Sequence, residues 1–500
     1  MSIPRLSPHE GRSTGLGAKF SSASLVIFFF CVFMLLSSAL GSTSIDPDKT
    51  NANRVASSAA ECSASSPQAL PDVAPTRFRF MPLRFVLAQQ AVAGYERGGV
   101  PLVGFDGTKF TPAGEGDDLG VYYFIPKVVT DFHLSVAKSI DLFIVSLIVF
   151  PLLVGLPGLY LLVSRQSYSP WGIVALCGLA AITARYGDVY VVQAGVIVAL
   201  VPWILYLAGG HPQYSFLAIF AFTCGIVCSL ANILRFQAST PFLVFAVIIL
   251  LFQVKSKLSR RIFLLVALFI GALVPQFYFH SLLNNRDRFL LAIDRCYVPA
   301  VPYHPTWHNV YTGLGFLNNP YGLVNKDESA IERVRAIAPQ ALYPSFAYEQ
   351  AVKKEVFRTL KAHPGFVLYS FMVKMGLLLL ISVICCGPGL IAAVRYPKLW
   401  PIECAFWSAM LTASLNGILV EPRAPYLLGF MALCVLYGFV SLEWRNRNTA
   451  GQAVAKYESL SLNGAPSGVA VTGTTMPLGW STAAEGSPLR PGANCEKGSS

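Results

Sequence analysis

Charged residues are scarce in this chain. Asp, Glu, Lys and Arg make up 13% of its 500 residues, whereas apolar residues make up 54%. So little charge cannot give several soluble domains a polar surface, and apolar runs of 18 or more residues recur along the chain. These features exclude a soluble multidomain protein and predict a polytopic membrane protein.

Metal-ligand motifs are also lacking. Eight of the eleven cysteines lie in apolar runs, where we interpret them as small apolar side chains. His304 and His308 have a spacing of four residues, but Pro305 lies between them and no carboxylate completes a zinc motif. No repeat of solenoid length is present either. The sequence therefore predicts no metal site at the cysteines or at this histidine pair.

Hydrophobic runs predict an all-α fold, a bundle of about ten transmembrane helices with two long outer-face loops. The first run follows a basic segment, 1–22, and we interpret it as a retained anchor rather than a cleaved signal peptide. Six further spans fill 139–281 and three fill 365–442. The expected spans are 23–41, 139–163, 170–185, 189–208, 214–234, 240–254, 262–280, 365–393, 401–420 and 424–442.

Basic residues set the expected orientation. Twelve Lys and Arg lie in the short segments on one side of the spans and three lie in the short turns on the other side. Because basic loops stay inside, both long segments, 42–138 and 282–364, are expected outside. The tail, 443–500, is expected to be inside and disordered. The net charge of +12 is explained by these loops and does not imply a nucleic-acid partner.

The first outer segment carries an acidic motif, GEGDDLGVYY. Before it, 77–95 mixes Arg with Phe and Leu, which predicts a helix in the membrane interface, basic on one side. Within the motif, Asp117 and Asp118 are adjacent. A carboxylate beside apolar surface has a raised pKa unless it is paired, which suits a general base. Clustered carboxylates would also suit a divalent cation such as Mg²⁺ or Mn²⁺, and an ordinary Asp-rich turn is the plain alternative.

The second outer segment contains YVPAVPYHPTWHNVYTGLGFLNNPYG, 297–322. Its Pro and Gly residues predict a tightly turned loop rather than an amphipathic helix. His308 is interpreted as a hydrogen-bond donor to phosphate or as an acid/base. The alternative is a Pro- and aromatic-rich plug over the bundle.

Isolated cations mark the outer ends of several spans. Lys374 lies about ten residues into its span, a depth at which a cation usually faces the bundle interior unless its side chain snorkels to the surface. Arg235 and Arg423 lie at outer turns, where Arg423 has Glu421 as a local partner. Arg185 and Asp188 are expected to form an anchor pair at another turn. Acids on one loop and cations on others suit a substrate with an anionic head and a lipid tail.

These features resemble the GT-C glycosyltransferases, polytopic membrane enzymes that use polyprenyl-phosphate sugars. The similarity lies in DDLGVYY in the first outer loop, HPTWHNVYTGLG in the later one, the entry His363-Pro364 with Lys374, and EPRAPYLL at a late outer turn. It implies an inverting hexosyl- or pentosyltransferase of the cell envelope, in a bacterial inner membrane with both termini cytoplasmic. Its partners would be a lipid-linked sugar, membrane lipids and a glycan, lipid or protein acceptor.

The resemblance also implies roles for individual residues. Asp117 or Asp118 would be the catalytic base. Donor phosphate would be held by basic side chains, and aromatic side chains would line the sugar and acceptor. The expected phosphate contacts are Lys374, Arg423, His304, His308 and Arg235, and the expected lining residues are Tyr122, Tyr123, Trp307 and Tyr311.

Two alternatives remain open. WHNVYTGLG also resembles the outer-loop segment of O-antigen ligases and polymerases, which transfer a whole glycan from a lipid pyrophosphate. A transporter or flippase is the other, although paired short, Gly/Pro-broken spans, which would favour it, are not evident.

Overall fold

Helices form nearly all the regular structure. The computed structural model describes residues 76, 78, 80–113, 118–162, 170–210, 213–295, 297, 306–341, 343, 345–396 and 399–463. Within these residues the chain forms fifteen helices and one two-stranded sheet. Two units are distinguished, residues 1–447 and 448–500, and the arrangement described below is that of the first.

Seven of these helices are long and apolar enough to cross a membrane, which confirms an all-α, multi-pass membrane protein. Two shorter apolar helices, α6 (Pro170–Tyr186) and α9 (Thr240–Phe252), also match expected spans. The first expected span, 23–41, lies outside the described residues. The seven long helices are α5 (Val136–Leu162), α7 (Val191–Gly209), α8 (Tyr214–Leu234), α10 (Leu258–Ile293), α14 (Pro364–Cys386), α16 (Trp400–Leu419) and α17 (Ala424–Asn463).

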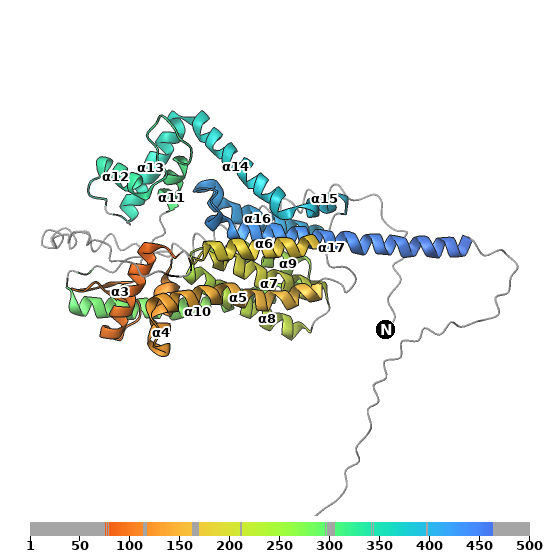
Figure 1. The fold of residues 1–500 in the computed structure, drawn as a ribbon, viewed down its shortest axis with the longest axis horizontal. Coiled ribbons are helices and arrows are strands. Elements are labelled where there is room, and N and C mark those ends of the chain that lie inside the picture. The colour runs from red at the N-terminus through yellow and green to blue at the C-terminus, as the bar shows by residue number, and fades with distance from the viewer. Residues whose placement is uncertain are drawn as a thin grey trace, which may run out of the picture. The chain divides into compact units, whose positions relative to one another are not determined.

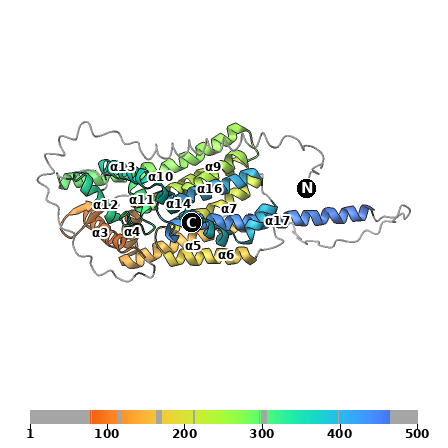
Figure 2. The same ribbon diagram turned by 90° about the horizontal axis from the view of Figure 1, so that it is seen from above.

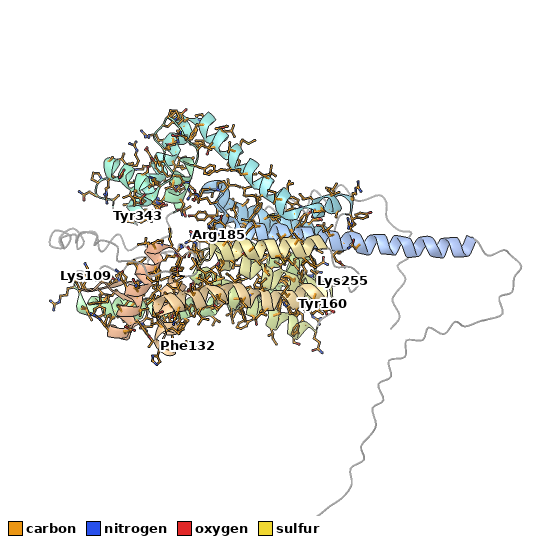
Figure 3. All side chains as sticks on the ribbon, in the orientation of Figure 1. Lys109, Phe132, Tyr160, Arg185, Lys255 and Tyr343 are labelled. Carbon is orange, nitrogen blue, oxygen red and sulfur yellow. The ribbon has the colours of Figure 1, made fainter. Side chains whose placement is uncertain are left out.

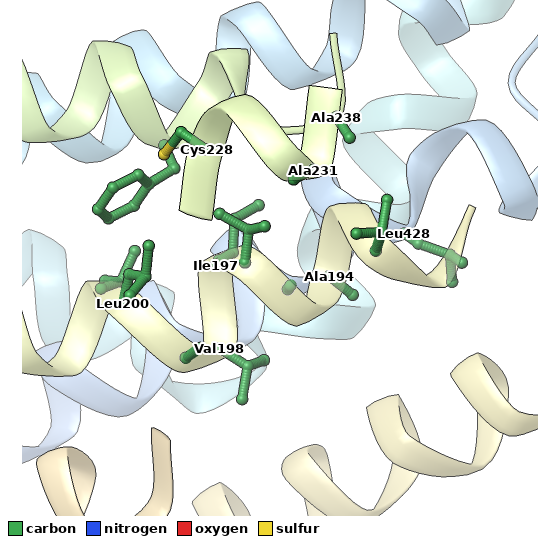
Figure 4. Packing of buried hydrophobic residues seen from close by; sticks show 14 of the residues in the cluster. Ala194, Ile197, Val198, Leu200, Cys228, Ala231, Ala238 and Leu428 are labelled. Atoms are coloured by element: carbon green, nitrogen blue, oxygen red, sulfur yellow. The ribbon is translucent and has the colours of Figure 1, made fainter. Parts of the chain in front are cut away.

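The apolar core is centred on α7 and α17, whose span windows are mostly buried, whereas α5, α10 and α14 expose most of theirs. Figure 2 shows α5 and α6 along one side of the bundle and α9 and α10 along the other. Ile197 and Leu200 of α7 pack in one cluster with Cys228 of α8 and Leu428 of α17 (Figure 4). The exposed apolar helices are those that meet lipid chains in a bilayer.

Two glycines let α8 and α10 cross in backbone contact. A Cβ atom on Gly225 would lie 2.0 Å from the carbonyl oxygen of Leu268, and one on Gly271 would lie 2.0 Å from that of Phe222. Since real side-chain carbons do not approach oxygen so closely, each position accepts only glycine without a shift of the helices.

The first long segment forms a helix, a hairpin and a second helix. α3 (Pro82–Gly98) packs on β1 (Val103–Phe105), which pairs antiparallel with β2 (Phe110–Pro112), and α4 (Leu119–Phe132) follows. The expected helix over 77–95 is present, although it begins five residues later. It was expected to be basic on one side, and Arg84, one of its basic residues, is buried. Asp117 lies outside the described residues.

The second long segment is helical over part of the range in which a turned loop was expected, whereas 315–322 forms a turned loop as expected. α10 continues to Ile293, and α11 (Thr306–Leu314), α12 (Asp327–Ile337) and α13 (Phe346–Ala362) follow. Their apolar side chains form a separate core. The carboxylate of Glu349 accepts the backbone N–H groups of Trp307 and His308, at 2.7 and 3.1 Å, and so caps the first turn of α11. This partner lies about forty residues away, which is why local sequence did not reveal the helix.

Two further boundaries differ from expectation. The span expected over 365–393 is divided at Gly387, whose φ of +51° favours glycine, into α14 and α15 (Pro388–Arg395). The tail expected to be disordered from 443 is helical as far as Asn463. Pro388 accounts for the break between α14 and α15, because a proline lacks the N–H that continues a helix.

Candidate functional site

A buried arginine connects two carboxylates at one end of the bundle. Arg84 Nε donates to Asp118 Oδ2 at 2.6 Å, and Arg84 Nη1 donates to Asp188 Oδ2 at 2.5 Å. All three residues are less than 9% exposed. A guanidinium group has donors on several edges, so one arginine can satisfy two acids at once.

A second arginine extends this set. Arg235 Nη1 contacts Asp118 Oδ1 at 3.3 Å, so Asp118 binds a different arginine through each oxygen. The guanidinium groups of Arg84 and Arg235 both lie over the ring of Tyr190, at 5.2 and 4.5 Å from its centroid. We call Arg84, Asp118, Asp188, Tyr190 and Arg235 the arginine cluster. It holds two positive and two negative side chains and is neutral as a whole.

Helix ends bring these residues together. Arg84 lies in the first turn of α3, Asp118 immediately precedes α4, and Arg235 immediately follows α8. Asp188 lies in the turn between α6 and α7, where its other oxygen accepts the N–H of Val189 at 2.7 Å. We call this end of the bundle the charged end. Figure 3 shows Arg185, near the end of α6, towards this end, and Tyr160 and Lys255 towards the other end of the bundle.

Burial and charge act against each other in the arginine cluster. Burial alone would lower the pKa of Arg84, but the charges of Asp118 and Asp188 outweigh it and raise that pKa above its ordinary value. Burial raises the pKa of Asp188, because the positive charge of Arg84 is shared with Asp118 and offsets burial only in part. Burial, and then the charge of Asp118, raise the pKa of Tyr122.

A second buried cation, Lys374, lies at a junction between the bundle and the second long segment. Its ammonium group donates to the carbonyl oxygens of Gly313 at 2.8 Å, Ile418 at 3.1 Å and Val420 at 2.8 Å. The residue is 3% exposed, so the side chain faces the interior, as expected, and does not snorkel. All three ammonium hydrogens are therefore directed at the ends of α11 and α16, which carry partial negative charge.

Glu421 completes this junction, in the turn between α16 and α17. Its carboxylate accepts from Asn325 Nδ2 at 2.6 Å and from Arg423 Nε at 2.7 Å, which confirms the expected local ion pair. Burial raises the pKa of Glu421, and the charge of Arg423 only partly opposes this. We call Gly313, Asn325, Lys374, Glu421 and Arg423 the lysine junction.

Tyr426 lies between the two sets. Its ring is 5.1 Å from that of Tyr190, centroid to centroid. It also interacts electrostatically with Arg235 and with Glu421. The arginine cluster and the lysine junction are thus neighbours at the charged end, joined through a pair of tyrosines.

His308 belongs to a third group, inside the second long segment. Its ring nitrogens contact Tyr348 Oη at 2.7 Å and Asp327 Oδ1 at 3.1 Å, and it is 2% exposed. The hydrogen bond from His308 lowers the pKa of Asp327. His304 lies outside the described residues, so the structure does not describe how it is placed relative to His308.

The expected aromatic lining residues are dispersed. Tyr122 is buried close to Asp118, while Tyr123 Oη shares a 2.6 Å hydrogen bond with Tyr278 of α10. Trp307 packs against Phe357, and Tyr311 is part of the separate core of α11 to α13. Of these four, Tyr122 alone has an interaction with the arginine cluster among the described residues.

Sequence reasoning missed Arg84 and gave Asp188 only a structural role. The expected pairing of Asp188 with Arg185 is wrong, because Asp188 binds Arg84 and Arg185 is exposed. The signal was present in part: an arginine inside an apolar helix and an aspartate at a glycine turn both require partners.

No metal-binding group of three or more His, Cys, Asp or Glu residues occurs in the part of the chain that the structure describes. Comparisons with protein-family models, curated proteins and solved structures find no match. Function is therefore inferred from the chemistry of the residues at the charged end.

Proposed function

We propose that the protein is a membrane glycosyltransferase that moves a sugar from a polyprenyl-phosphate donor to an acceptor hydroxyl, with inversion. The arginine cluster carries the proposal: a buried carboxylate, Asp118, is in contact with two arginines at one end of a membrane bundle. This set combines the two chemistries that the transfer needs. A carboxylate can take the acceptor's proton, and guanidinium groups can hold a phosphate.

Asp118 is the proposed base, activated when donor binds. The contact of Arg235 with Asp118, at 3.3 Å, is longer than that of Arg84, at 2.6 Å. A donor phosphate would compete for Arg235 and leave Oδ1 of Asp118 to accept the acceptor's proton, while Arg84 keeps the carboxylate in position. The acceptor oxygen then attacks the anomeric carbon opposite the phosphate, which leaves with the electron pair of the glycosidic bond.

Arg423 is the second proposed phosphate contact, because its side chain is 66% exposed although Glu421 orients it. Contacts by Lys374 or His308 remain predictions, and each requires a present hydrogen bond to be replaced. Those assigned to Asp117 and His304 concern residues outside the described ranges.

The exposed apolar surface of α14 supports a lipid-linked donor. Its buried residues form one line, Ser370, Lys374, Leu378 and Cys386, and the rest of the helix is accessible to acyl chains. A polyprenyl tail could therefore stay in the bilayer while its phosphate reaches the charged end. In this proposal the charged end faces outward from a bacterial inner membrane, with both termini cytoplasmic.

Reconstitution with radiolabelled polyprenyl-phosphate sugars tests the proposal. We expect Asp118→Asn to retain donor binding and lose turnover by about 10²–10⁴-fold. Asp188→Asn is the matched control, since it also weakens the hold on Arg84 but removes no proposed base, and we expect a much smaller loss. Normal turnover in Asp118→Asn would rule out this base. Passage of donor across the bilayer with no transfer product would instead favour a flippase.

A further inference from the structure

The exposed face of α13 is basic and apolar. Lys354, Phe357, Arg358, Leu360 and Lys361 are all exposed. At 100° per residue these positions fall on one side of the helix. Phe357 is 43% exposed and Leu360 is 42% exposed although each is a large apolar side chain.

Both acidic residues of α13 are on its other side. Glu349 is 1% exposed and Glu355 is 6% exposed. Glu349 caps α11, while Glu355 accepts from Arg333 at 2.7 Å and also contacts Arg358. Lys354 and Lys361 form no ion pair with any described residue. The outward face therefore presents positive charge around an aromatic ring.

Chain continuity places this face close to a membrane surface. α13 ends at Ala362, and the apolar helix α14 begins at Pro364, with His363 between them. At about 1.5 Å per residue, Arg358 lies no more than about 9 Å along the helix from Pro364. The headgroup layer on each side of a bilayer is about 5–7 Å thick, which long basic side chains can reach.

The start of α14 exposes apolar side chains close in sequence to α13. Figure 1 shows α14 running obliquely from α13 towards the bundle rather than lying along it. Near its start, Leu368 is 62% exposed and Tyr369 is 61% exposed. An aromatic and basic helix beside exposed apolar side chains has the composition of an interfacial helix.

We propose that the exposed face of α13 binds the anionic headgroups of bilayer phospholipids. Lys354, Arg358 and Lys361 contact headgroup phosphates, and Phe357 lies at the boundary with the acyl chains. This contact is independent of the proposed transferase activity. It would support the second long segment on the membrane, since α11 and α12 pack on the opposite side of α13.

Photocrosslinking of the full-length protein in nanodiscs tests this contact. Phe357 is replaced by p-benzoylphenylalanine, and the nanodiscs contain an equal mixture of phosphatidylglycerol and phosphatidylcholine without polyprenyl lipids. We expect lipid adducts with about a fivefold or greater preference for phosphatidylglycerol, the effect of a single basic residue near an anionic surface. The same probe at Ile337, which is 45% exposed on α12, is expected to give no lipid adduct.

Two further measurements separate charge from simple exposure. In the triple variant Lys354→Gln, Arg358→Gln and Lys361→Gln, the preference should fall to about one while adducts persist. High salt should also reduce the preference of the probe at 357 when all three basic residues are present. This measurement does not depend on whether the triple variant folds. Absence of lipid adducts at 357, equal adducts at 337, or a preference that neither change affects would each overturn the proposal.

Discussion

The arginine cluster and the lysine junction bury positive charge at the same end of the bundle in different ways. Arg84 is held by two carboxylates, whereas Lys374 is held by three backbone carbonyl groups. A planar guanidinium fork suits paired acids, and a compact ammonium group suits converging helix ends. The first set contains charges that a ligand can redistribute. The second fixes the position of one segment on another.

Removal of Arg84 gives the largest expected effect. In Arg84→Met, Asp118 keeps Arg235 but Asp188 loses its guanidinium partner while still buried. Breaking a buried ion pair from one side costs about 3–5 kcal/mol, which we expect in the free energy of unfolding measured in detergent. The matched control is Arg235→Met, which removes the longer contact with Asp118 and leaves both contacts of Arg84 in place. A larger loss in the control would contradict the central position of Arg84.

Lys374→Met tests the lysine junction. Three carbonyl oxygens lose their donor, and we expect a loss of about 1–3 kcal/mol in unfolding free energy. Hydrogen exchange should accelerate in α11 in particular, because Gly313 at its end is one of the three acceptors. Lys374→Arg should restore protection only in part, since a planar fork fits three converging carbonyls poorly. Unchanged exchange in α11 would show that the junction does not hold this segment.

The pH dependence of the unfolding free energy tests the raised pKa of Asp188, which shares Arg84 with Asp118. The pKa of Asp188 is raised on folding, so the folded state binds more protons just above the ordinary value of 3.8. Its contribution is thus fully present below the unfolded-state pKa and is lost as pH rises through the folded one. In Asp188→Asn, this pH-dependent contribution to the unfolding free energy is absent. The unfolding midpoint of the unsubstituted protein should fall relative to that of Asp188→Asn as pH rises through that window, and parallel curves would contradict the shift.

Arg423→Gln has the smallest expected effect on stability. The ion pair with Glu421 is exposed on the arginine side, so its loss should cost less than about 1 kcal/mol. Donor affinity is expected to fall nonetheless if Arg423 contacts phosphate. Thermal unfolding and binding of a radiolabelled polyprenyl phosphate separate the two effects, and intact donor binding would remove Arg423 from the proposed site.

The sequence predicted the apolar helices well because hydrophobic runs report membrane burial residue by residue. It did not predict which helix ends meet. Asp188 pairs with Arg84, 104 residues away, although Arg185 is three residues away. Gly187, with φ +37°, turns the chain between Arg185 and Asp188. Tertiary contacts, and not spacing, select the partner of a buried charge.

The loop expected over 297–322 illustrates the same limit. Its Pro and Gly residues are real turn signals, but α11 still forms within it. The N–H groups of Trp307 and His308 find their acceptor in Glu349, on a different helix. Asp118 was predicted as a site residue because acids near apolar spans are costly, yet its two arginine partners were beyond the reach of local patterns.

The crossing of α8 and α10 has a mechanical consequence for the arginine cluster. Gly225 lies in α8, ten residues before Arg235, which immediately follows that helix, so about 15 Å of α8 separates the crossing from Arg235. With backbone against backbone at Gly225 and Gly271, the helices have no side-chain layer that could compress. The crossing is therefore a fixed pivot. A single methyl group added there would tilt α8 and displace the guanidinium group of Arg235.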